Sequence, residues 1–452
     1  MVSTSPTAVR PLKSAGLSSV AVDDPNGQAG KEGRAGAFED AASSEGDAPH
    51  GVALVADEQR AHWIETFIGV REETERRAAP LSPEDQIVQS MPDTSPTKWH
   101  RAHTSWFFEQ FLLVPHARDY RPFDERFSYL FNSYYVAAGE RHARPRRGLV
   151  TRPDVNQIAA YRSHIDAAVC NLIASAPTRD LATILSVVEI GLHHEQQHQE
   201  LMLTDILHAF AQNPTAPAYD RGWRADQLVT GATEFIDLPE GIHEIGHDGD
   251  GFAFDNESPR HRALVGAGRI ARGLVTNRQW LEFMADAGYA TASLWLSDGW
   301  TQVQTEGWTA PEYWWSHDGQ WQTMTLGGLQ PVDPNAAVTH VSYYEADAFA
   351  RWADKALPSE IEWEVACRSG RIASAFGVVW QWTRSAYSAY PGYRAATGAL
   401  GEYNGKFMIN QMVLRGSSFA TPAGHARASY RNFFYPSARW QFTGLRLTED
   451  RG

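Results

Sequence analysis

The spacing of apolar residues changes near residue 211, and this change constrains the fold more than any other feature of the chain. Upstream, apolar residues recur three or four positions apart, as an amphipathic helix requires. The longest run of this kind spans 181–210, and shorter ones are expected near 57–77, 96–114 and 158–172. Four such segments predict a four-helix bundle, whose interior is a common location for metal sites.

Downstream of this point the sequence favours an α+β domain. Prolines and glycines are frequent in 211–232, which predicts a connector with turns. Short strand-like runs follow at 241–245 and 412–414, and helices are expected at 277–287 and 344–355. The predicted fold class is therefore multidomain, with an α domain followed by an α+β domain.

Length and composition complete the predicted division of the chain. A chain of 452 residues is too long for one ordinary hydrophobic core. Its first part is rich in Ala, Gly, Ser, Pro and Asp, with Phe38 as its one aromatic residue, so it buries too little surface to offset the entropy of ordering. The predicted parts are a disordered tail (1–52), a helical bundle (53–212), a linker (213–232) and a second domain (233–452).

Charge and cysteine content exclude several classes of function. The net charge of -14 argues against a nucleic-acid partner or an anionic membrane surface, because both require clustered Lys and Arg. No window approaches the roughly 18 to 20 apolar residues of a membrane span, and the first thirty residues lack a signal-peptide core, so we expect a cytoplasmic protein. The two cysteines, Cys170 and Cys367, cannot build a disulfide framework, and we expect both to be buried as small apolar side chains.

The strongest local signal is the run HEQQH at 194–198. Four residues advance a helix by about 400°, so His194 and His198 lie on one face, one turn apart, and can bind one ion. His193 points elsewhere and is expected at the surface or behind the ligands. The same run fits the zinc-protease pattern, in which Glu195 would be the general base.

A third ligand is available in the segment WHRAH at 99–103. Either His100 or His103 could reach inward, and spacing alone does not decide between them; the other is expected to be a solvated helix residue. Three histidines with open coordination positions indicate a reactive metal site rather than a structural one. The residues do not identify the metal, since zinc, copper, cobalt or nickel would bind as readily.

Both halves of the chain resemble one known family. KWHRAH (98–103) and HEQQH (194–198) are similar to the DinB-like domain of ergothioneine-biosynthesis sulfoxide synthases. NRQWLEF (277–283), LPSEIEWE (357–364) and LRGSS (414–418) resemble the formylglycine-generating-enzyme-like domain, a C-type-lectin-like α+β fold, that these synthases carry. The resemblance covers about residues 55–450, and the presence of both halves is far more specific than either motif alone.

The resemblance implies a reaction and a cofactor. Such synthases use Fe(II) and dioxygen to join hercynine, which is Nα-trimethylhistidine, to a thiol at the ring carbon between the two nitrogens, giving a sulfoxide. The thiol is cysteine or γ-glutamylcysteine. By the family pattern the metal ligands are His103, His194 and His198.

The segment 134–148 resembles the branch of the family that uses free cysteine. Tyr134 and Tyr135 occupy its position for active-site tyrosines, whose phenols can donate a proton near the metal. In the arginine-rich stretch that follows, Arg144 is predicted to bind the cysteine carboxylate in a two-pronged manner, with Arg141 and Arg147 as secondary candidates.

The segment YRNFFYP at 430–436 resembles the part of the family that recognises the trimethylammonium group. A quaternary ammonium donates no hydrogen bond and is held by ring faces, a role that Phe433 and Phe434 fit, with Asn432 near the carboxylate. Gln197 is predicted to contact the substrate imidazole.

The sequence departs from the family pattern at several points, which include ALPS at 356–359 in place of RLPT and a short stretch between Glu364 and Gly377. The second domain has no cysteine pair near its end, so formylglycine-generating activity is chemically unavailable. GVVWQWT at 377–383 replaces the more usual GNVWEWT. Three alternatives stay open, namely an ovothiol-type histidine–cysteine sulfoxide synthase, a DinB-like zinc hydrolase or thiol transferase, and a non-catalytic lectin-like binding module.

Overall fold

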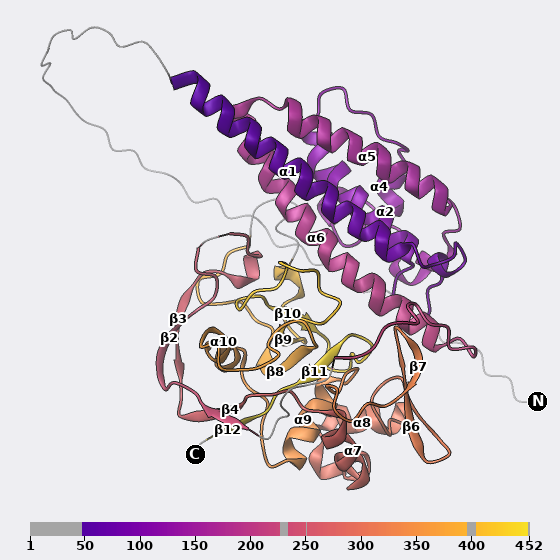
Figure 1. Ribbon diagram of the computed structural model, residues 1–452, viewed down its shortest axis with the longest axis vertical. Coiled ribbons are helices and arrows are strands. Elements are labelled where there is room, and N and C mark those ends of the chain that lie inside the picture. Colours follow the sequence, from indigo (N-terminus) through magenta and orange to yellow (C-terminus); the bar gives the residue numbers. More distant parts are fainter. Residues whose placement is uncertain (1–47, 227–233, 250, 396–403, 451–452) are drawn as a thin grey trace, which may run out of the picture. The chain divides into compact units, whose positions relative to one another are not determined.

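The computed structural model describes residues 48–226, 234–249, 251–395 and 404–450 (Figure 1). Most of the predicted tail and the end of the predicted linker, 227–232, lie outside these residues, so both boundaries stay predictions. The helical part and the α+β part belong to one compact unit, Val52–Gly452. Among the described helices, none combines the length and the apolar character needed to cross a lipid bilayer.

Four long helices form the N-terminal part and lie side by side in Figure 1. Helix α2 packs against both α5 and α6, and α5 also contacts α6. An N-terminal capping box starts α5, where the Asp154 carboxylate accepts from the backbone of Gln157 and the Gln157 side chain accepts in return. The helices of this part are α1 (Ala48–Ala78), α2 (Thr97–Phe108), α3 (Val114–His116), α4 (Phe127–Leu130), α5 (Val155–Ser175) and α6 (Thr178–Ala211).

The helix predicted at 96–114 is present, but it is not α-helical throughout. After α2 the chain forms a π-helical turn at Glu109–Leu113 before the short α3. The buried Glu109 carboxylate accepts from the hydroxyls of Tyr120 and Tyr161, at 2.6 and 2.7 Å. Such a turn adds a residue locally without changing the apolar pattern around it, so periodicity alone could not reveal it.

The described residues of the α+β part form four small sheets. Strand β9 is central to the largest, where it pairs antiparallel with β8 and β10, while β11 runs parallel to β8. Through this pairing Phe433 of β10 lies opposite Val413 of β9. The strands are β1 (Phe235–Asp237), β2 (Gly241–Ile245), β3 (His261–Val265), β4 (Gly268–Ala271), β5 (Trp314–His317), β6 (Gln320–Thr325), β7 (Gly328–Pro331), β8 (Trp380–Ala386), β9 (Met412–Gly416), β10 (Asn432–Phe434), β11 (Thr443–Leu445) and β12 (Thr448–Asp450).

Helices of this part start at clear sequence signals. Thr276, Ser342 and Ser359 each cap a helix through a capping box, which satisfies backbone N–H groups of the first turn. The helices predicted at 277–287 and 344–355 are present with slightly different ends. The bounds are α7 (Asn277–Ala285), α8 (Ser297–Glu306), α9 (Tyr343–Trp352) and α10 (Glu360–Arg368).

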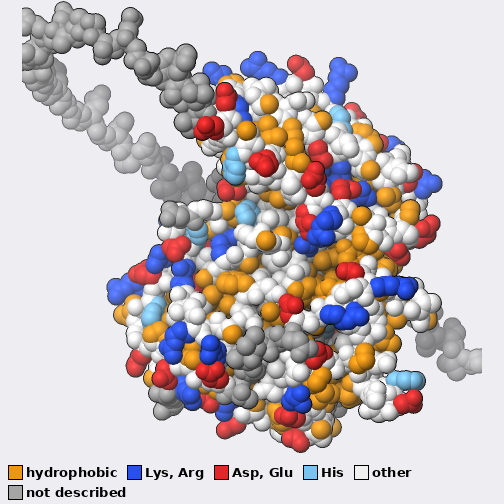
Figure 2. Space-filling model, viewed as in Figure 1, with side chains coloured by type: hydrophobic (Ala, Val, Ile, Leu, Met, Phe, Trp, Pro, Cys, Tyr) orange, Lys and Arg blue, Asp and Glu red, His pale blue; other side chains and the backbone are white. Residues whose placement is uncertain are grey.

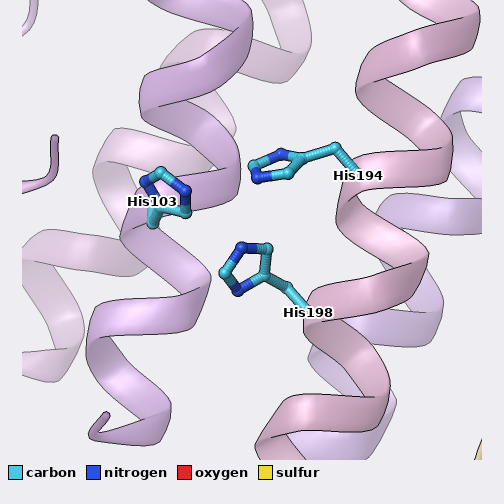
Figure 3. Close-up of side chains that lie close together, drawn as sticks. All are labelled: His103, His194 and His198. Carbon is cyan, nitrogen blue, oxygen red and sulfur yellow. The ribbon is translucent and has the colours of Figure 1, made fainter. Parts of the chain in front are cut away.

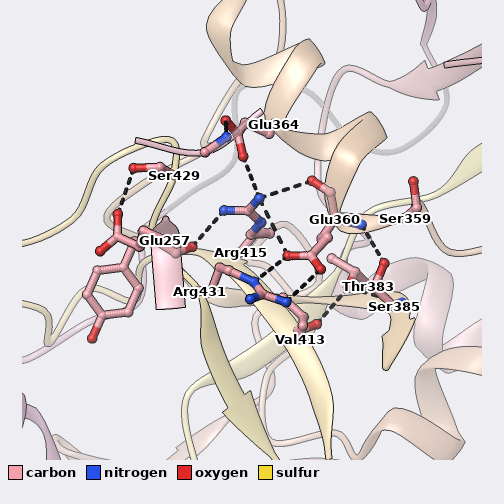
Figure 4. A network of polar contacts seen from close by, with 12 residues as sticks. Glu257, Ser359, Glu360, Glu364, Thr383, Ser385, Val413, Arg415, Ser429 and Arg431 are labelled. Atoms are coloured by element: carbon pink, nitrogen blue, oxygen red, sulfur yellow. Dashed lines mark hydrogen bonds and ion pairs between the residues drawn. The ribbon is translucent and has the colours of Figure 1, made fainter. Parts of the chain in front are cut away.

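A buried ionic network holds the segment that leads into β10 (Figure 4). Arg415 of β9 is fully buried, pairs with Glu364 at 2.6 Å, and donates to the backbone carbonyl of Tyr430 at 3.0 Å. Arg431 makes two bonds to Glu360, at 2.8 and 2.9 Å. Each charge has an opposite partner, which offsets part of the cost of burying it, and Arg415 holds the backbone carbonyls of Ala428 and Tyr430.

The prediction that both cysteines are buried is wrong. Both Cys170 and Cys367 are partly exposed to solvent. Each follows a residue that is fully buried, Val169 or Ala366. One position along a helix turns the side chain by about 100°, which moves these thiols to the edge of the buried face.

Candidate metal centre

Three imidazole rings converge between α2 and α6 (Figure 3). One ligand atom from each of His103, His194 and His198 lies within 4.8 Å of the others, and the ring centroids are 4.6 to 4.9 Å apart. His194 and His198 project from successive turns of α6, and His103 faces them from α2. Among the described residues this is the one group of three histidine, cysteine or carboxylate side chains that could hold a metal ion.

The ring of His103 is oriented by its surroundings. Its Nδ1 donates to the backbone carbonyl of Phe131 at 2.6 Å, which leaves Nε2 with a lone pair. That buried Nε2 has no hydrogen-bond partner among the residues that the structure describes. Trp99 and Trp106 stack on the ring at 4.5 and 5.4 Å. A buried imidazole with a free lone pair and a fixed outer N–H is the usual state of a metal ligand.

A second relay orients His198. The Nδ1 atoms of His198 and His100 are 2.8 Å apart, and His100 Nε2 lies 3.0 Å from Oδ2 of Asp205. Since the carboxylate accepts from His100 Nε2, the other nitrogen of His100 accepts from His198 Nδ1. The remaining nitrogen of His198 is therefore the one with a lone pair.

The expectation that the unused histidine of 99–103 would be solvated is wrong. His100 is 2% exposed and lies behind His198, because Asp205 of α6 provides a buried acceptor for its second nitrogen. Spacing within α2 could not show this, since Asp205 is distant in sequence.

The three rings are electrically neutral. Burial and the neighbouring imidazoles hold the pKa of His103 and His198 well below the ordinary value, and burial lowers the pKa of His194 to about 3. Neutral imidazole is the form that binds a metal, so the site is ready for a cation without first releasing protons. The donor set of three neutral nitrogens fits a first-row divalent ion.

Glu195, next to His194, does not face the three rings. Its fully buried carboxylate accepts from Arg71 at 2.8 Å, Arg162 at 3.0 Å and the hydroxyl of Thr74 at 2.6 Å. Burial alone would raise the pKa of Glu195, but the two guanidinium groups lower it to about 2. Both oxygens are engaged on the α1 and α5 side, so the carboxylate cannot serve as a base for water at the metal.

A cavity of about 480 Å³, here called the central cavity, lies along α6. Gln197 and Asp205 of α6 belong to its wall, whereas the three histidine rings themselves do not line it among the described residues. Six residues predicted from the sequence to act at the site meet around it, namely Tyr134, Arg144, Gln197, Asn432, Phe433 and Phe434.

Aromatic rings form one side of the central cavity. Phe433 stacks on Tyr387 at 4.0 Å and lies 6.1 Å from Phe407, whose ring meets Tyr134 edge to face at 5.0 Å. Faces of this kind attract a cation that cannot donate hydrogen bonds. Arg144, across the cavity, is exposed and donates to the backbone carbonyl of Asp93.

Three predicted residues do not line the central cavity. Tyr135 is fully buried, stacks on Tyr134 at 4.6 Å, and lies 5.6 Å from Trp106, which in turn stacks on His103. Arg147 is also buried, with its guanidinium 3.4 Å from the Trp99 ring centre and bonded to Ser95. Arg141 is exposed and is not among the residues that line the central cavity.

Sequence reasoning missed a polar cluster on the side of α6 that contacts the α+β part. His193 was expected at the surface or behind the ligands, but it stacks on Phe252 at 3.8 Å and lies 3.0 Å from His425. Tyr430 accepts from Gln197 at 2.6 Å. Only the segment 430–436 carried a signal for this cluster; His425 had none, because its partners come from another domain.

Comparisons with known proteins agree with this architecture. Residues 66–202 match the DinB superfamily, and 224–378 match the sulfatase-modifying factor enzyme 1-like domain. The hercynine oxygenase of Mycolicibacterium thermoresistibile is 30% identical over 445 residues, covering 88% of this chain and 96% of the relative. The chain belongs to the hercynine oxygenase family. The hercynine oxygenase of Mycolicibacterium smegmatis is 28% identical, covering 80% of this chain and 92% of that one.

Membership of the hercynine oxygenase family confirms the predicted fold class, a DinB-like helical domain followed by a formylglycine-generating-enzyme-like domain. The second domain alone is 33% identical over 153 residues to the formylglycine-generating enzyme of Thermomonospora curvata, a match that covers 31% of this chain and 50% of that enzyme. All three converging histidines fall within the DinB match, and the aromatic side of the central cavity lies mainly in the second part of the chain.

Proposed function

We propose that this protein is an iron(II)-dependent oxygenase that joins the sulfur of cysteine to the imidazole ring of hercynine and oxidises that sulfur to a sulfoxide. The observation that carries the proposal is the convergence of His103, His194 and His198, with a cavity along the same helix α6 that has an aromatic side and an arginine. Relatives that are named hercynine oxygenase and span nearly the same length support the choice of substrate.

The reaction balances with dioxygen as the oxidant. One ring C–H bond and one S–H bond are broken, and a C–S bond forms. The sulfur also gains one oxygen atom, and the second oxygen leaves as water with the two hydrogens. Four electrons pass from the substrates to one dioxygen, so no further reductant is needed.

Each part of the site has a role in this proposal. Iron held by three neutral imidazoles supplies the redox chemistry and lowers the pKa of a bound thiol. Arg144 binds the cysteine carboxylate, and the ring faces of Phe433 and Phe434 hold the trimethylammonium group. The hydroxyl of Tyr134, at the cavity wall, donates a proton to the reacting centre, while Tyr135 holds Tyr134 in place by stacking.

The zinc-hydrolase alternative requires Glu195 as a general base. Its carboxylate is bonded to Arg71 and Arg162 and is part of the bundle core instead. A synthase that uses plain histidine would not need a box of aromatic faces, because a primary ammonium group is better recognised by hydrogen-bond acceptors. The aromatic side of the cavity therefore favours the trimethylated substrate.

The test begins with protein reconstituted with iron(II) under anaerobic conditions. Hercynine and cysteine are added, air is admitted, and oxygen uptake and product mass are followed. We expect uptake of one dioxygen per product and a sulfoxide conjugate of the two substrates. Parallel reactions with histidine and with γ-glutamylcysteine define which partner the site accepts at each position.

Two variants make the result specific. His103→Ala should lose bound iron and all oxygen uptake, whereas His62→Ala, which removes an exposed histidine of α1, should behave as wild type. A product formed with histidine but not with hercynine would overturn the substrate assignment. Hydrolysis without oxygen uptake would overturn the reaction class.

A further inference from the structure

Tyr387, the residue directly after β8, packs against the aromatic side of the central cavity. Its ring stacks on that of Phe433, with the ring centres 4.0 Å apart and the ring planes 12° from parallel. Tyr387 is 1% exposed and is not among the described residues that line the cavity, whereas Phe433 is partly exposed and lines it. One face of Phe433 is therefore covered by protein, and only the opposite face can meet a bound group.

Hydrogen bonds hold Tyr387 at its backbone and at the tip of its side chain. The backbone N–H donates to the carbonyl of Gln411 at 2.8 Å, and the backbone carbonyl accepts from the N–H of Ile409 at 3.1 Å. The hydroxyl oxygen accepts from Nδ2 of Asn256 at 2.9 Å. The ring is anchored at both ends, so it cannot turn away from Phe433 without breaking buried hydrogen bonds.

Asn256 is itself fixed by Arg431. Its Nδ2 also donates to the backbone carbonyl of Arg431 at 3.3 Å, and because a carbonyl can only accept, the NH₂ group faces this side. In return the Arg431 guanidinium donates to the backbone carbonyl of Asn256 at 2.9 Å. Arg431 is paired with Glu360 in the buried ionic network (Figure 4). This network therefore reaches Phe433 through Asn256 and Tyr387.

We propose that Tyr387 is a positioning residue for the cation of the substrate: it supports one face of Phe433, so that the other face is held toward the quaternary ammonium group. This inference rests on the proposed function, since it concerns the ammonium group of hercynine. The attraction between a cation and a ring depends on the cation lying over the ring face. A partly exposed phenylalanine without such support could adopt other rotamers, and its face would no longer be fixed.

A general packing role for Tyr387 is the competing explanation. A buried tyrosine contributes to the core wherever it lies, and its loss would weaken the binding of all ligands of one shape to the same extent. The positioning role predicts a different result. It should change the preference for a charged ligand over a neutral ligand of equal shape, because only the charged ligand is attracted to the ring face.

The experiment measures dissociation constants by anaerobic calorimetry on the metal-loaded full chain. The ligands are hercynine and its neutral isostere, in which a tert-butyl group replaces the trimethylammonium group. Wild type should prefer hercynine by about fivefold or more, because ring faces attract the cation and not the neutral group.

Two substitutions at Tyr387 separate the ring from the hydroxyl. Tyr387→Met occupies similar space without a flat ring, so the preference should fall by about threefold or more. Tyr387→Phe keeps the ring that supports Phe433, so the preference should stay within about twofold of the wild-type value. In a Phe433→Leu background, Tyr387→Met should have no further effect on the ratio.

Tyr289→Met is the matched control. Tyr289 is a buried tyrosine of the same part of the chain, where its ring lies 5.6 Å from Phe283 and 5.5 Å from Trp295. It is not among the described residues that line the central cavity. The ratio of the two dissociation constants should therefore stay at the wild-type value in this variant.

A measurement on wild type tests the fixed ring independently of any variant. An analogue with three ethyl groups on the ammonium nitrogen has the same charge as hercynine and a larger volume. A ring that cannot retreat should bind this analogue about tenfold or more weakly than hercynine, since a rigid pocket discriminates against added methylene groups. Equal binding of the two cations would show that Phe433 is not held in place and would overturn the positioning role.

The outcomes separate the positioning role from the proposed function. If wild type binds no hercynine, the proposed function fails and the positioning role falls with it. If wild type prefers hercynine but Tyr387→Met keeps the same preference, the positioning role is overturned and the proposed function stands. An equal loss in Tyr387→Phe and Tyr387→Met also overturns it, because the hydroxyl and not the supporting ring would then set the preference.

Discussion

Helix α6 carries a carboxylate on each of two faces, and the partners of the two carboxylates differ in charge. On the bundle side, Glu195 is paired with Arg71 and Arg162, and its pKa is lowered to about 2. On the side of the α+β domain, Glu200 accepts only from neutral groups, the indole of Trp380 and the hydroxyls of Ser418 and Thr421, at 2.6 to 2.7 Å. Burial raises the pKa of Glu200 above its ordinary value.

One helix therefore contributes charged pairs to the bundle core and neutral hydrogen bonds to the contact with the α+β domain. Charged pairs inside the bundle make Glu195 costly to remove, because Arg71 and Arg162 share its buried carboxylate and would be left with Asp166 and Glu75, which are more exposed. Neutral donors across the domain contact hold Glu200 without an ion pair, so a neutral amide can replace its carboxylate at small cost. On the face of the molecule in Figure 2, acidic and basic side chains are interspersed, and neither sign forms a large patch there.

The largest effect is expected at Glu195. Glu195→Gln removes the buried carboxylate that Arg71 and Arg162 share and leaves them with Asp166 and Glu75, so it should lower the free energy of unfolding by about 3 kcal/mol, measured by denaturant titration. A general base would behave otherwise, with unfolding nearly unchanged and only activity lost. That result would contradict the difference between Glu195 and Glu200 and would favour the hydrolase alternative.

A buried histidine should make the α+β side lose stability in mild acid. His340 is 3% exposed and burial lowers its pKa to about 3, so the folded state binds no proton there while the unfolded chain does so below about 6.5. Wild-type stability should therefore decline as the pH falls from 6.5 toward 3, by about 2 kcal/mol at pH 5 relative to a chain without this group.

The matched variant for this prediction is His340→Asn. The backbone of His340 has φ 62°, a conformation that asparagine tolerates better than most residues. Denaturant midpoints of wild type and variant are compared from pH 7.5 to 5. A constant difference over that range would show that His340 is not the acid-sensitive group.

A smaller effect is expected behind the metal centre. Asp205→Asn removes the charge that orients His100 and, through it, His198, and should weaken metal binding by about tenfold. The affinity is measured by anaerobic competition with a chelator. Asp180→Asn, at an exposed position near the start of α6, is the control. Equal metal affinities for both variants would show that Asp205 does not orient the metal ligand His198.

The smallest effect is expected for Glu200→Gln. Glutamine keeps an acceptor oxygen for the neutral donors and no longer carries a buried charge, so the free energy of unfolding at neutral pH should change by less than about 1 kcal/mol. This is the same substitution on the same helix as Glu195→Gln. Similar losses for the two variants would show that the two faces of α6 do not differ.

The pairing of His194 with His198 could be predicted because helical periodicity places residues four apart on one face. The same local logic found the capped helices α7 and α9. It did not find the π-helical turn after α2, since one inserted residue leaves the apolar pattern intact. Nor could it separate His100 from His103, because the distinction depends on Asp205 and Phe131, which lie elsewhere in the sequence.

By itself the sequence determined the two fold classes, the helix that carries HEQQH and, through family resemblance, the set of residues around the central cavity. The partners of Glu195 and Glu200, the burial of His100, and the separation of Tyr134 and Arg144 at the cavity from Tyr135 and Arg147 in the core depend on the tertiary structure. The physical reason is that periodicity and capping act within one or two turns, whereas burial and hydrogen-bond partners are supplied by segments far away along the chain.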